Sequence, residues 1–194
     1  MDIQPVAFNA LIKKRRSVFP DQFEPGKKIP DEIVAQLVEN ATWAPNHGRM
    51  EPWQFTVFAG DGLQKLADFQ SELYKQEAEN FNESKYIKLK SQPLKASHII
   101  AIGMKRTSKK SIPEIEDIEA VACAVQNIYL SITVYQLGGY WTTGGITYME
   151  KAKPFFGLSD EDKLLGFFYL GYISLPSGSA TRKPIHEKVK WVRE

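Results

Sequence analysis

Cysteine is almost absent from this 194-residue sequence, and no apolar run in it is long enough to cross a membrane. The only cysteine, Cys123, lies in the apolar run IEAVACAVQNIYL, which excludes an intramolecular disulfide and any metal site built from several cysteines. We expect Cys123 to be a small buried side chain of a core helix. The first residues also lack the apolar segment of a secretory leader, so the sequence favours a cytoplasmic protein.

A strong net charge is lacking too. The chain has 25 basic and 23 acidic residues, a formal charge of +2. So small an excess creates no long-range field that would collect nucleic acid or an anionic membrane surface. Selectivity for anions must therefore come from local clusters, and we expect small-molecule partners rather than nucleic acid or a membrane.

Motifs for self-sufficient catalysis are also missing. The sequence contains no phosphate-binding P-loop, no GxGxxG after a strand, no GxSxG and no HExxH. Its three histidines, His47, His98 and His186, are scattered without metal-ligand spacing, so no metal site is predicted. No side chain is predicted to be catalytic by itself, and an enzyme of this sequence would depend on a bound cofactor for its chemistry.

The sequence does contain the core pattern of one domain spanning residues 1–194. Its composition, 43% hydrophobic and 12% aromatic, is ample for a single core. Helical spacing of apolar residues predicts helices within 3–16, 27–45 and 112–139. Segments rich in β-branched and aromatic residues predict strands within 51–60, 97–104, 139–145 and 164–173.

The order of these elements predicts an α+β fold, an α/β sandwich. Its central sheet would be mixed, mostly antiparallel, with about four strands flanked by helices. Residues 61–95 have helical composition without a strong apolar stripe, which predicts exposed or mobile helices around 75–90. The long apolar helix within 112–139 leaves apolar surface for a second subunit.

Four segments combine cations, hydrogen-bonding groups or paired glycines outside the regular elements. RRS (15–17) follows a helix, and APNHGRMEPW (44–53) joins a helix to a strand. WTTGG (141–145) ends in glycines that let backbone N–H groups approach a ligand, and TRKP (181–184) places two cations before a proline. Taken alone, the cations at 13–16 are ordinary solvated complements of a helix dipole, with an anion site as the alternative.

Together with GFFYLGY, these four segments resemble, in order and spacing, the nitroreductase family of flavin mononucleotide (FMN) oxidoreductases, in its small single-domain branch. The resemblance spans nearly the whole chain apart from 61–95. It implies a homodimer with FMN sites at the subunit interface. It also implies an enzyme in which the flavin takes hydride from NADH or NADPH and reduces nitroaromatic, quinone or enone-type acceptors by a ping-pong mechanism.

The resemblance assigns the anionic end of the cofactor by position. Residues matched to the family's contacts with the phosphate, ribityl chain and ring edge are Arg15, Arg16 and Ser17. The family's late phosphate clamp is matched by Arg182 and Lys183. The two lysines at 13 and 14 are then left to solvent.

The resemblance assigns the flavin ring to two loops. The loop that lies against the ring is matched by Trp141, Thr142, Thr143, Gly144 and Gly145. The loop that reaches the flavin from the other subunit is matched by Pro45, Asn46 and His47. Trp43 stands where relatives can have Arg, and it is expected either to stack near the ring or to pack at the helix end.

One departure and two alternative functions accompany this interpretation. Glu51 replaces the Gln that often precedes the family's Pro-Trp pair. One alternative is a flavin-binding storage or sensor protein without turnover. The other is a nucleic-acid binder that uses the basic segments with Trp and Tyr as stacking platforms, which the near-zero net charge opposes. The physiological acceptor and the choice between NADH and NADPH do not follow from the sequence.

Overall fold

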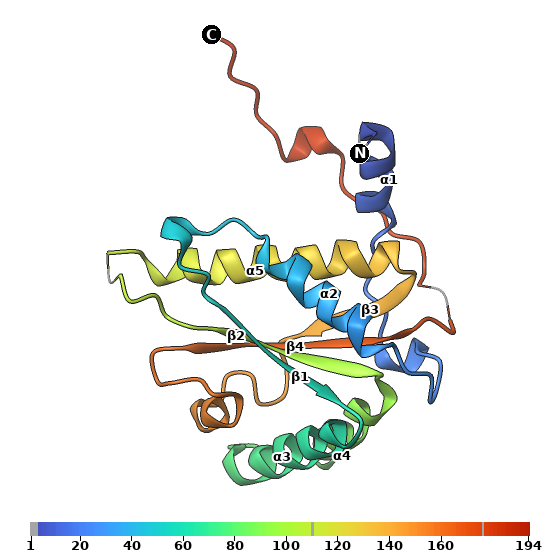
Figure 1. Cartoon of the computed structure of the whole chain (residues 1–194), viewed down its shortest axis with the longest axis vertical. Coiled ribbons are helices and arrows are strands. Elements are labelled where there is room, and N and C mark those ends of the chain that lie inside the picture. The colour runs from blue at the N-terminus through green and yellow to red at the C-terminus, as the bar shows by residue number, and fades with distance from the viewer. Residues whose placement is uncertain (1–3, 110, 176) are drawn as a thin grey trace.

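Four strands form the central sheet of the computed structural model, which describes residues 4–109, 111–175 and 177–194 (Figure 1). Across the sheet the order is β1 (Trp53–Ala59), β2 (His98–Met104), β4 (Lys163–Tyr172) and β3 (Leu137–Thr142). The α+β class and the number of strands are confirmed.

The expectation of a mixed sheet was wrong, because all three strand pairings are antiparallel. Between β1 and β2 the chain forms α3 (Asp61–Glu77) and α4 (Glu83–Ser91), which pack on each other. This helical hairpin returns the chain to the end of the sheet at which β1 finished. The next strand must therefore run in the opposite direction.

Helices α2 (Asp31–Thr42) and α5 (Glu114–Val134) cover one face of the sheet (Figure 1). They enclose a core in which Leu37 of α2 and Val121 and Ile128 of α5 are fully buried against β2 and β4. The predicted long central helix is confirmed, with Glu114, Glu116 and Asp117 in its first turn, where acidic groups complement the helix dipole.

Helices α3 and α4 lie on the opposite face together with η4 (Glu150–Phe156), a 3₁₀ helix. The exposed helix expected around 75–90 is α4, none of whose residues is buried. The expectation that 61–95 lacks an apolar stripe was wrong for α3. Its residues Leu63, Leu66 and Tyr74 are buried among polar neighbours, because the stripe is narrow and interrupted by Gln and Ser.

The two ends of the described chain project from the α5 side of the molecule (Figure 1). Helix α1 (Pro5–Lys14) has no buried residue, and residues 178–194, which include the short η5 (Ile185–Glu187), are exposed throughout. The remaining 3₁₀ helices are η1 (Pro20–Gln22), η2 (His47–Arg49) and η3 (Gln92–Lys95).

Cys123 is exposed, so its predicted burial was wrong. It lies on α5 between the residues that face the sheet, and its side chain points to the outer surface of that helix. Within the described residues, none of the helices combines the length and the apolar character that a membrane span requires.

A bulge in the sheet lies beside the loop that follows β3. The pairing of β2 with β4 shifts register at Ile102 and Gly103, opposite the segment around Gly166. Gly166 has φ +116, and a Cβ there would lie 2.2 Å from the carbonyl oxygen of Thr142, so only glycine fits. Bulges often redirect the chain near functional sites. This one brings β4 close to the end of β3.

Candidate cofactor site

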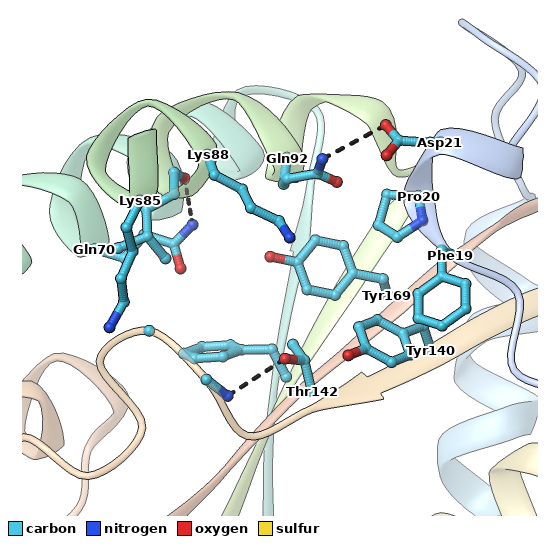
Figure 2. Close-up of a pocket in the computed structure, with 14 residues that line it drawn as sticks. Phe19, Pro20, Asp21, Gln70, Lys85, Lys88, Gln92, Tyr140, Thr142 and Tyr169 are labelled. Atoms are coloured by element: carbon cyan, nitrogen blue, oxygen red, sulfur yellow. Dashed lines mark hydrogen bonds between the residues drawn. The ribbon is translucent and has the colours of Figure 1, made fainter. Parts of the chain in front are cut away.

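A cavity of about 430 Å³ opens between α4 and the loop after β3, on the α3–α4 side of the sheet (Figure 2). Thr142, Gly144 and Gly145 of the predicted ring-contacting loop form one wall. The floor consists of aromatic side chains from the 15–23 segment, β3 and β4, namely Phe19, Tyr140, Phe167 and Tyr169. Such a cavity is large enough for a flat heterocycle and presents it with aromatic rings.

The opposite wall comes from the segment that sequence reasoning could not match. Lys85 and Lys88 extend from α4 toward the tyrosines and the glycine loop, and Gln92 closes the end of the cavity (Figure 2). Asp21 lies at the same end and is paired with Lys95 at 2.5 Å, a contact that lowers the pKa of the Asp21 carboxyl. The signal available in the sequence was the polar, lysine-rich stretch itself, which is typical of any solvated helix.

The two glycines of the loop wall allow a ligand to come close to the backbone. Gly145 has φ +70, and a Cβ there would lie 2.8 Å from Cδ2 of Leu89 across the cavity. At Gly144 the nearest atom to a Cβ would be Oγ1 of Thr142, 3.6 Å away, so the backbone here is open on the cavity side. The N–H of Gly144 donates to that same hydroxyl oxygen at 3.3 Å. The predicted pair of glycines therefore has a structural reason.

Tyr169 is the most deeply buried polar group of the floor, with 6% of its surface exposed. Burial raises the pKa of its phenol to about 12, and a hydrogen bond with Gln70 opposes that rise in part. Gln70 is itself fixed, because its amide donates to the backbone oxygen of Leu89 at 2.6 Å. Tyr169 thus stays protonated at any physiological pH.

Tyr169 should remain un-ionised at about pH 11, where ordinary tyrosines with a pKa near 10 have lost their protons. Stability that depends on the neutral phenol is present below pH 10 and is lost as pH rises toward 12. Tyr169→Phe should therefore leave the tyrosinate absorbance of the folded protein at about pH 11 unchanged. In the urea-unfolded protein, where the phenol is exposed, the same substitution should lower the absorbance by one tyrosine. An equal loss in the folded protein would contradict the raised pKa of Tyr169.

The predicted anion-binding residues lie at the edge of β3. The N–H of Val18 donates to the carbonyl of Gly139 at 2.9 Å, which fixes the segment after α1 alongside the strand. The guanidinium carbon of Arg15 lies 5.0 Å from the centre of the Tyr129 ring, and Oγ of Ser17 lies 3.4 Å from the Tyr129 hydroxyl. Arg15 and Ser17 are thus held together on α5.

Arg16 has a different environment. Its guanidinium donates to the backbone oxygens of Lys13 and Arg15, at 2.7 and 2.9 Å, so it satisfies carbonyls at the end of α1. The late pair is exposed: Arg182 donates only to the carbonyl of the preceding Thr181 among the contacts found in the described chain, and Lys183 is also exposed. Within one described chain the predicted phosphate clamp is therefore not closed.

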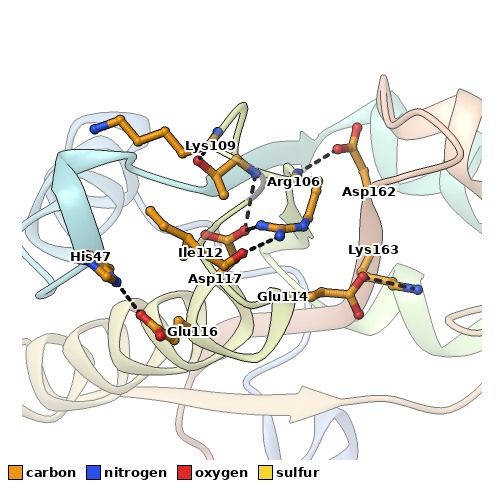
Figure 3. A network of polar contacts seen from close by, with 10 residues as sticks. His47, Arg106, Lys109, Ile112, Glu114, Glu116, Asp117, Asp162 and Lys163 are labelled. Atoms are coloured by element: carbon orange, nitrogen blue, oxygen red, sulfur yellow. Dashed lines mark hydrogen bonds and ion pairs between the residues drawn. The ribbon is translucent and has the colours of Figure 1, made fainter.

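The predicted trans-reaching loop lies at the other end of α5. The Nδ1–H of His47 donates to the Glu116 carboxylate at 2.5 Å (Figure 3). The side-chain oxygen of Asn46 accepts from the N–H of Glu51 at 3.0 Å. Arg49 and Glu51 both have positive φ, which non-glycine residues adopt only at a cost. Pro45 and Trp43 are exposed, Trp43 by 80%. Trp43 does end α2 as its C-cap residue, but the expectation that its side chain packs there was wrong for the single chain.

Helix geometry gives the distance between the His47 loop and the Arg15–Ser17 segment. His47 contacts Glu116 and Arg15 contacts Tyr129, and thirteen residues of one continuous helix separate those two positions. At a rise of about 1.5 Å per residue the separation is about 20 Å. One chain therefore does not bring the His47 loop to Arg15. Among the residues that the structure describes, no group of three His, Cys, Asp or Glu side chains could hold a metal ion.

Comparison with known families gives the context of this geometry. The family model described as "Nitroreductase family" matches residues 12–172. The chain belongs to the nitroreductase family. Among curated nitroreductases, "Putative NAD(P)H nitroreductase YdjA" of Escherichia coli is 29% identical over 154 residues, which cover 79% of this chain and 82% of YdjA.

Solved nitroreductase structures share the fold over the whole chain. A "Nitroreductase-like Family Protein" from Bacillus cereus is 26% identical, with a TM-score of 0.83 and full coverage of both chains. A nitroreductase from Desulfovibrio desulfuricans, whose structure was determined in complex with FMN, is 22% identical with a TM-score of 0.69, over 100% of this chain and 99% of that one.

Proposed function

We propose that this nitroreductase-family chain is an FMN-dependent oxidoreductase that takes hydride from NADH or NADPH and reduces nitroaromatic, quinone or enone-type acceptors. The observation that carries the proposal is the cavity between the Gly144–Gly145 loop and α4, with an aromatic floor and two lysines on its wall. The FMN-bound Desulfovibrio structure and the name of YdjA support the same reaction class.

The residues of the cavity suit the ring of FMN. Thr142, Thr143 and the two glycines would lie against one side of it, where the absence of side chains at 144 and 145 allows backbone N–H groups to approach. Lys85 and Lys88 would face the polar edge of the ring, where cations favour the negative charge that develops on reduction. When bound, FMN supplies the hydride and electron transfer that no side chain of this protein can perform.

Arg15 and Ser17 would hold the phosphate end, with Arg16, Arg182 and Lys183 as further contacts. A phosphate dianion is matched well by a guanidinium fork together with a point charge. FMN bound in the cavity would leave one ring face for both substrates, so donor and acceptor would occupy it in turn. That alternation is the basis of the proposed ping-pong mechanism.

The functional unit is proposed to be a homodimer in which each site takes residues from both chains. The 20 Å between the His47 end and the Arg15 end of α5 supports this arrangement, because a twofold axis across antiparallel α5 helices would bring one end of each chain to the other end of its partner. Pro45, Asn46 and His47, with the exposed Trp43, would then reach the flavin of the other subunit. Exposed apolar side chains on α1, α5 and the C-terminal segment are available for burial.

Purified protein should be yellow, and heat denaturation should release FMN, identified by chromatography against FAD and riboflavin standards. Adding NADH or NADPH without oxygen should bleach the bound flavin, and an acceptor should restore the colour. A flavin that stays oxidised with both donors would favour the storage or sensor alternative. A colourless protein that takes up no FMN would refute the proposal.

Substitution of Gly145 tests the site, and substitution of Gly157 provides a matched control. Gly145 and Gly157 have almost the same φ, +70 and +69, so alanine strains the backbone similarly at both, by about 1 kcal/mol. Only Gly145 lines the cavity; a Cβ at Gly157 would have no atom within 4 Å. Gly145→Ala should therefore weaken FMN binding about tenfold or more, whereas Gly157→Ala should bind FMN like the wild type. Equal FMN affinities in the two variants would mean that the flavin does not bind in this cavity.

A further inference from the structure

Tyr129 of α5 touches two of the segments that the proposed cofactor site requires, 15–17 and 141–145, although nothing in the sequence marked it. Its side chain is buried, with 8% of its surface exposed, and its ring meets that of Phe168 edge-on at 4.7 Å. The contact with Phe168 of β4 fixes the ring against the sheet. The hydroxyl and the outer ring face remain for contacts with other segments.

The hydroxyl group of Tyr129 joins the RRS segment to the ring-contacting loop. The backbone N–H of Trp141, the last residue but one of β3, donates to it at 2.9 Å, just before the loop begins. Because the oxygen accepts that hydrogen bond, its own proton is free to be donated to Oγ of Ser17, 3.4 Å away. The indole N–H of Trp141 is fixed separately, by the carbonyl of Leu165 at 2.9 Å.

The ring face of Tyr129 holds Arg15. The guanidinium carbon lies 5.0 Å from the ring centre, within the range of a cation–π contact. No ion pair with a carboxylate is found for Arg15 within the described residues, so its charge is not neutralised there. The same corner receives the C-terminal segment, because Oγ of Ser177 donates to the backbone oxygen of Ser17 at 3.2 Å.

We propose that Tyr129 is a positioning residue for the cofactor: its ring orients Arg15 toward the phosphate of FMN, and its hydroxyl fixes the loop that contacts the flavin ring. The proposal rests on the proposed FMN function. A guanidinium that is stacked on a ring keeps all five N–H donors in a plane with few rotamers, so little conformational entropy is lost when it binds a phosphate. A guanidinium free in solvent would lose more.

The two roles can be separated by two substitutions and two ligands. Tyr129→Phe keeps the ring and removes the hydroxyl, so it should weaken FMN and riboflavin binding by the same factor, about 3–10-fold, through the loop. Tyr129→Leu removes both groups. It should weaken FMN binding by a further 3–10-fold and leave riboflavin, which has no phosphate, at the level of Tyr129→Phe. Tyr135→Phe, at the exposed end of the same helix, is the control and should change neither affinity.

The measurement is a titration of apoprotein with each flavin by fluorescence quenching, after thermal melting has shown that the variant is folded. The decisive quantity is the ratio of FMN to riboflavin affinity, which a loss of general packing would leave unchanged. A Tyr129→Leu variant whose ratio equals that of the wild type would overturn the role assigned to the ring. Tyr129→Phe affinities equal to the wild type for both flavins would overturn the role assigned to the hydroxyl.

A second set of variants tests whether the ring acts through Arg15. Arg15→Lys keeps the charge without the planar stack, so it should lower the affinity ratio both in the wild type and in Tyr129→Phe, which keeps the ring, but not in Tyr129→Leu. In an Arg15→Ala background, Tyr129→Leu should have no further effect on the ratio, because the ring acts through Arg15. An additional fall there would overturn the proposal. If the wild type binds FMN but the variants give these contrary results, only the role of Tyr129 is refuted. If the wild type does not bind FMN, the proposed function is refuted.

Discussion

Replacing Arg106 with alanine is expected to destabilise the fold by about 3–5 kcal/mol, the typical result of removing one member of a buried ion pair. Arg106 follows β2, and 12% of its side chain is exposed, compared with 4% for its partner Asp117. One guanidinium nitrogen lies 2.5 Å from Oδ2 of Asp117, and the other donates to the carbonyl of Ile112 (Figure 3). The pair fastens the first turns of α5 to the end of β2.

Most of the lost stability would come from leaving the Asp117 carboxylate buried without its partner. Without Arg106 the buried carboxylate would keep, among the hydrogen bonds from the described residues, the one from the backbone N–H of Thr107, at 3.2 Å. Asp162 should be less affected, because it accepts from the backbone N–H of residue 106, which every substitution except proline retains. Burial by itself would raise the pKa of Asp162, but hydrogen bonds from the backbone N–H groups of Ser159 and Arg106 hold it below its usual value.

Urea unfolding at fixed protein concentration measures this effect, because a change in midpoint at constant slope reports stability. Lys163→Ala is the matched control. It removes an ion pair with Glu114 that is 3.8 Å long and about four-tenths exposed on both sides, so it should cost less than about 1 kcal/mol. The double variant Arg106→Met with Asp117→Leu should recover much of the loss, because no unpaired charge is left buried. Equal midpoints for Arg106→Ala and Lys163→Ala would contradict the network.

The strands and long helices could be predicted from the sequence because their signals are local. The run LLGFFYLGYI predicted β4, and GYWT predicted β3, since a strand buried on both faces must be apolar nearly throughout. Helix α5 followed from its acidic start and apolar middle. Strand direction did not follow, because it depends on how α3 and α4 fold back on each other. The burial of Cys123 did not follow either, since the apolar run gives no indication of which face of α5 meets the sheet.

Some residues of the candidate site could likewise be predicted from the sequence, and others could not. Thr142, Gly144 and Gly145 could be found because paired glycines are conspicuous and have a conformational reason. Lys85 and Lys88 could not, because a pocket-facing lysine on an exposed helix has the same sequence pattern as a solvated one. Tyr129 looked like one more apolar residue of α5. Its contacts with residues 15 and 17 arise only when segments more than a hundred residues apart meet, and its contact with residue 141 arises only when β3 packs back on α5.

A heterodimer that carries Arg15→Ala in one chain and His47→Ala in the other is expected to contain one FMN site with wild-type affinity. If each site combines Arg15 of one chain with His47 of its partner, the heterodimer has one site with both residues intact and one with neither. The homodimers lack any intact site. Arg15→Ala should weaken binding by about 10–100-fold, the range for a hydrogen bond to a charged group, and His47→Ala by about 3–10-fold.

Co-expression of the two variants with different affinity tags, followed by purification on both tags, isolates the heterodimer. Titrating it with FMN should reveal one tight site per dimer and one site weaker than in either homodimer. If Arg15 and His47 served the same flavin within one chain, the heterodimer would contain one site of each single-variant affinity and no tight site. The distance along α5 predicts the first outcome, because about 20 Å separates the His47 contact from the Arg15 contact within a chain. A heterodimer without a tight site would therefore place both residues in one subunit's site. A His47→Ala homodimer with wild-type affinity at both sites would remove His47 from the site altogether.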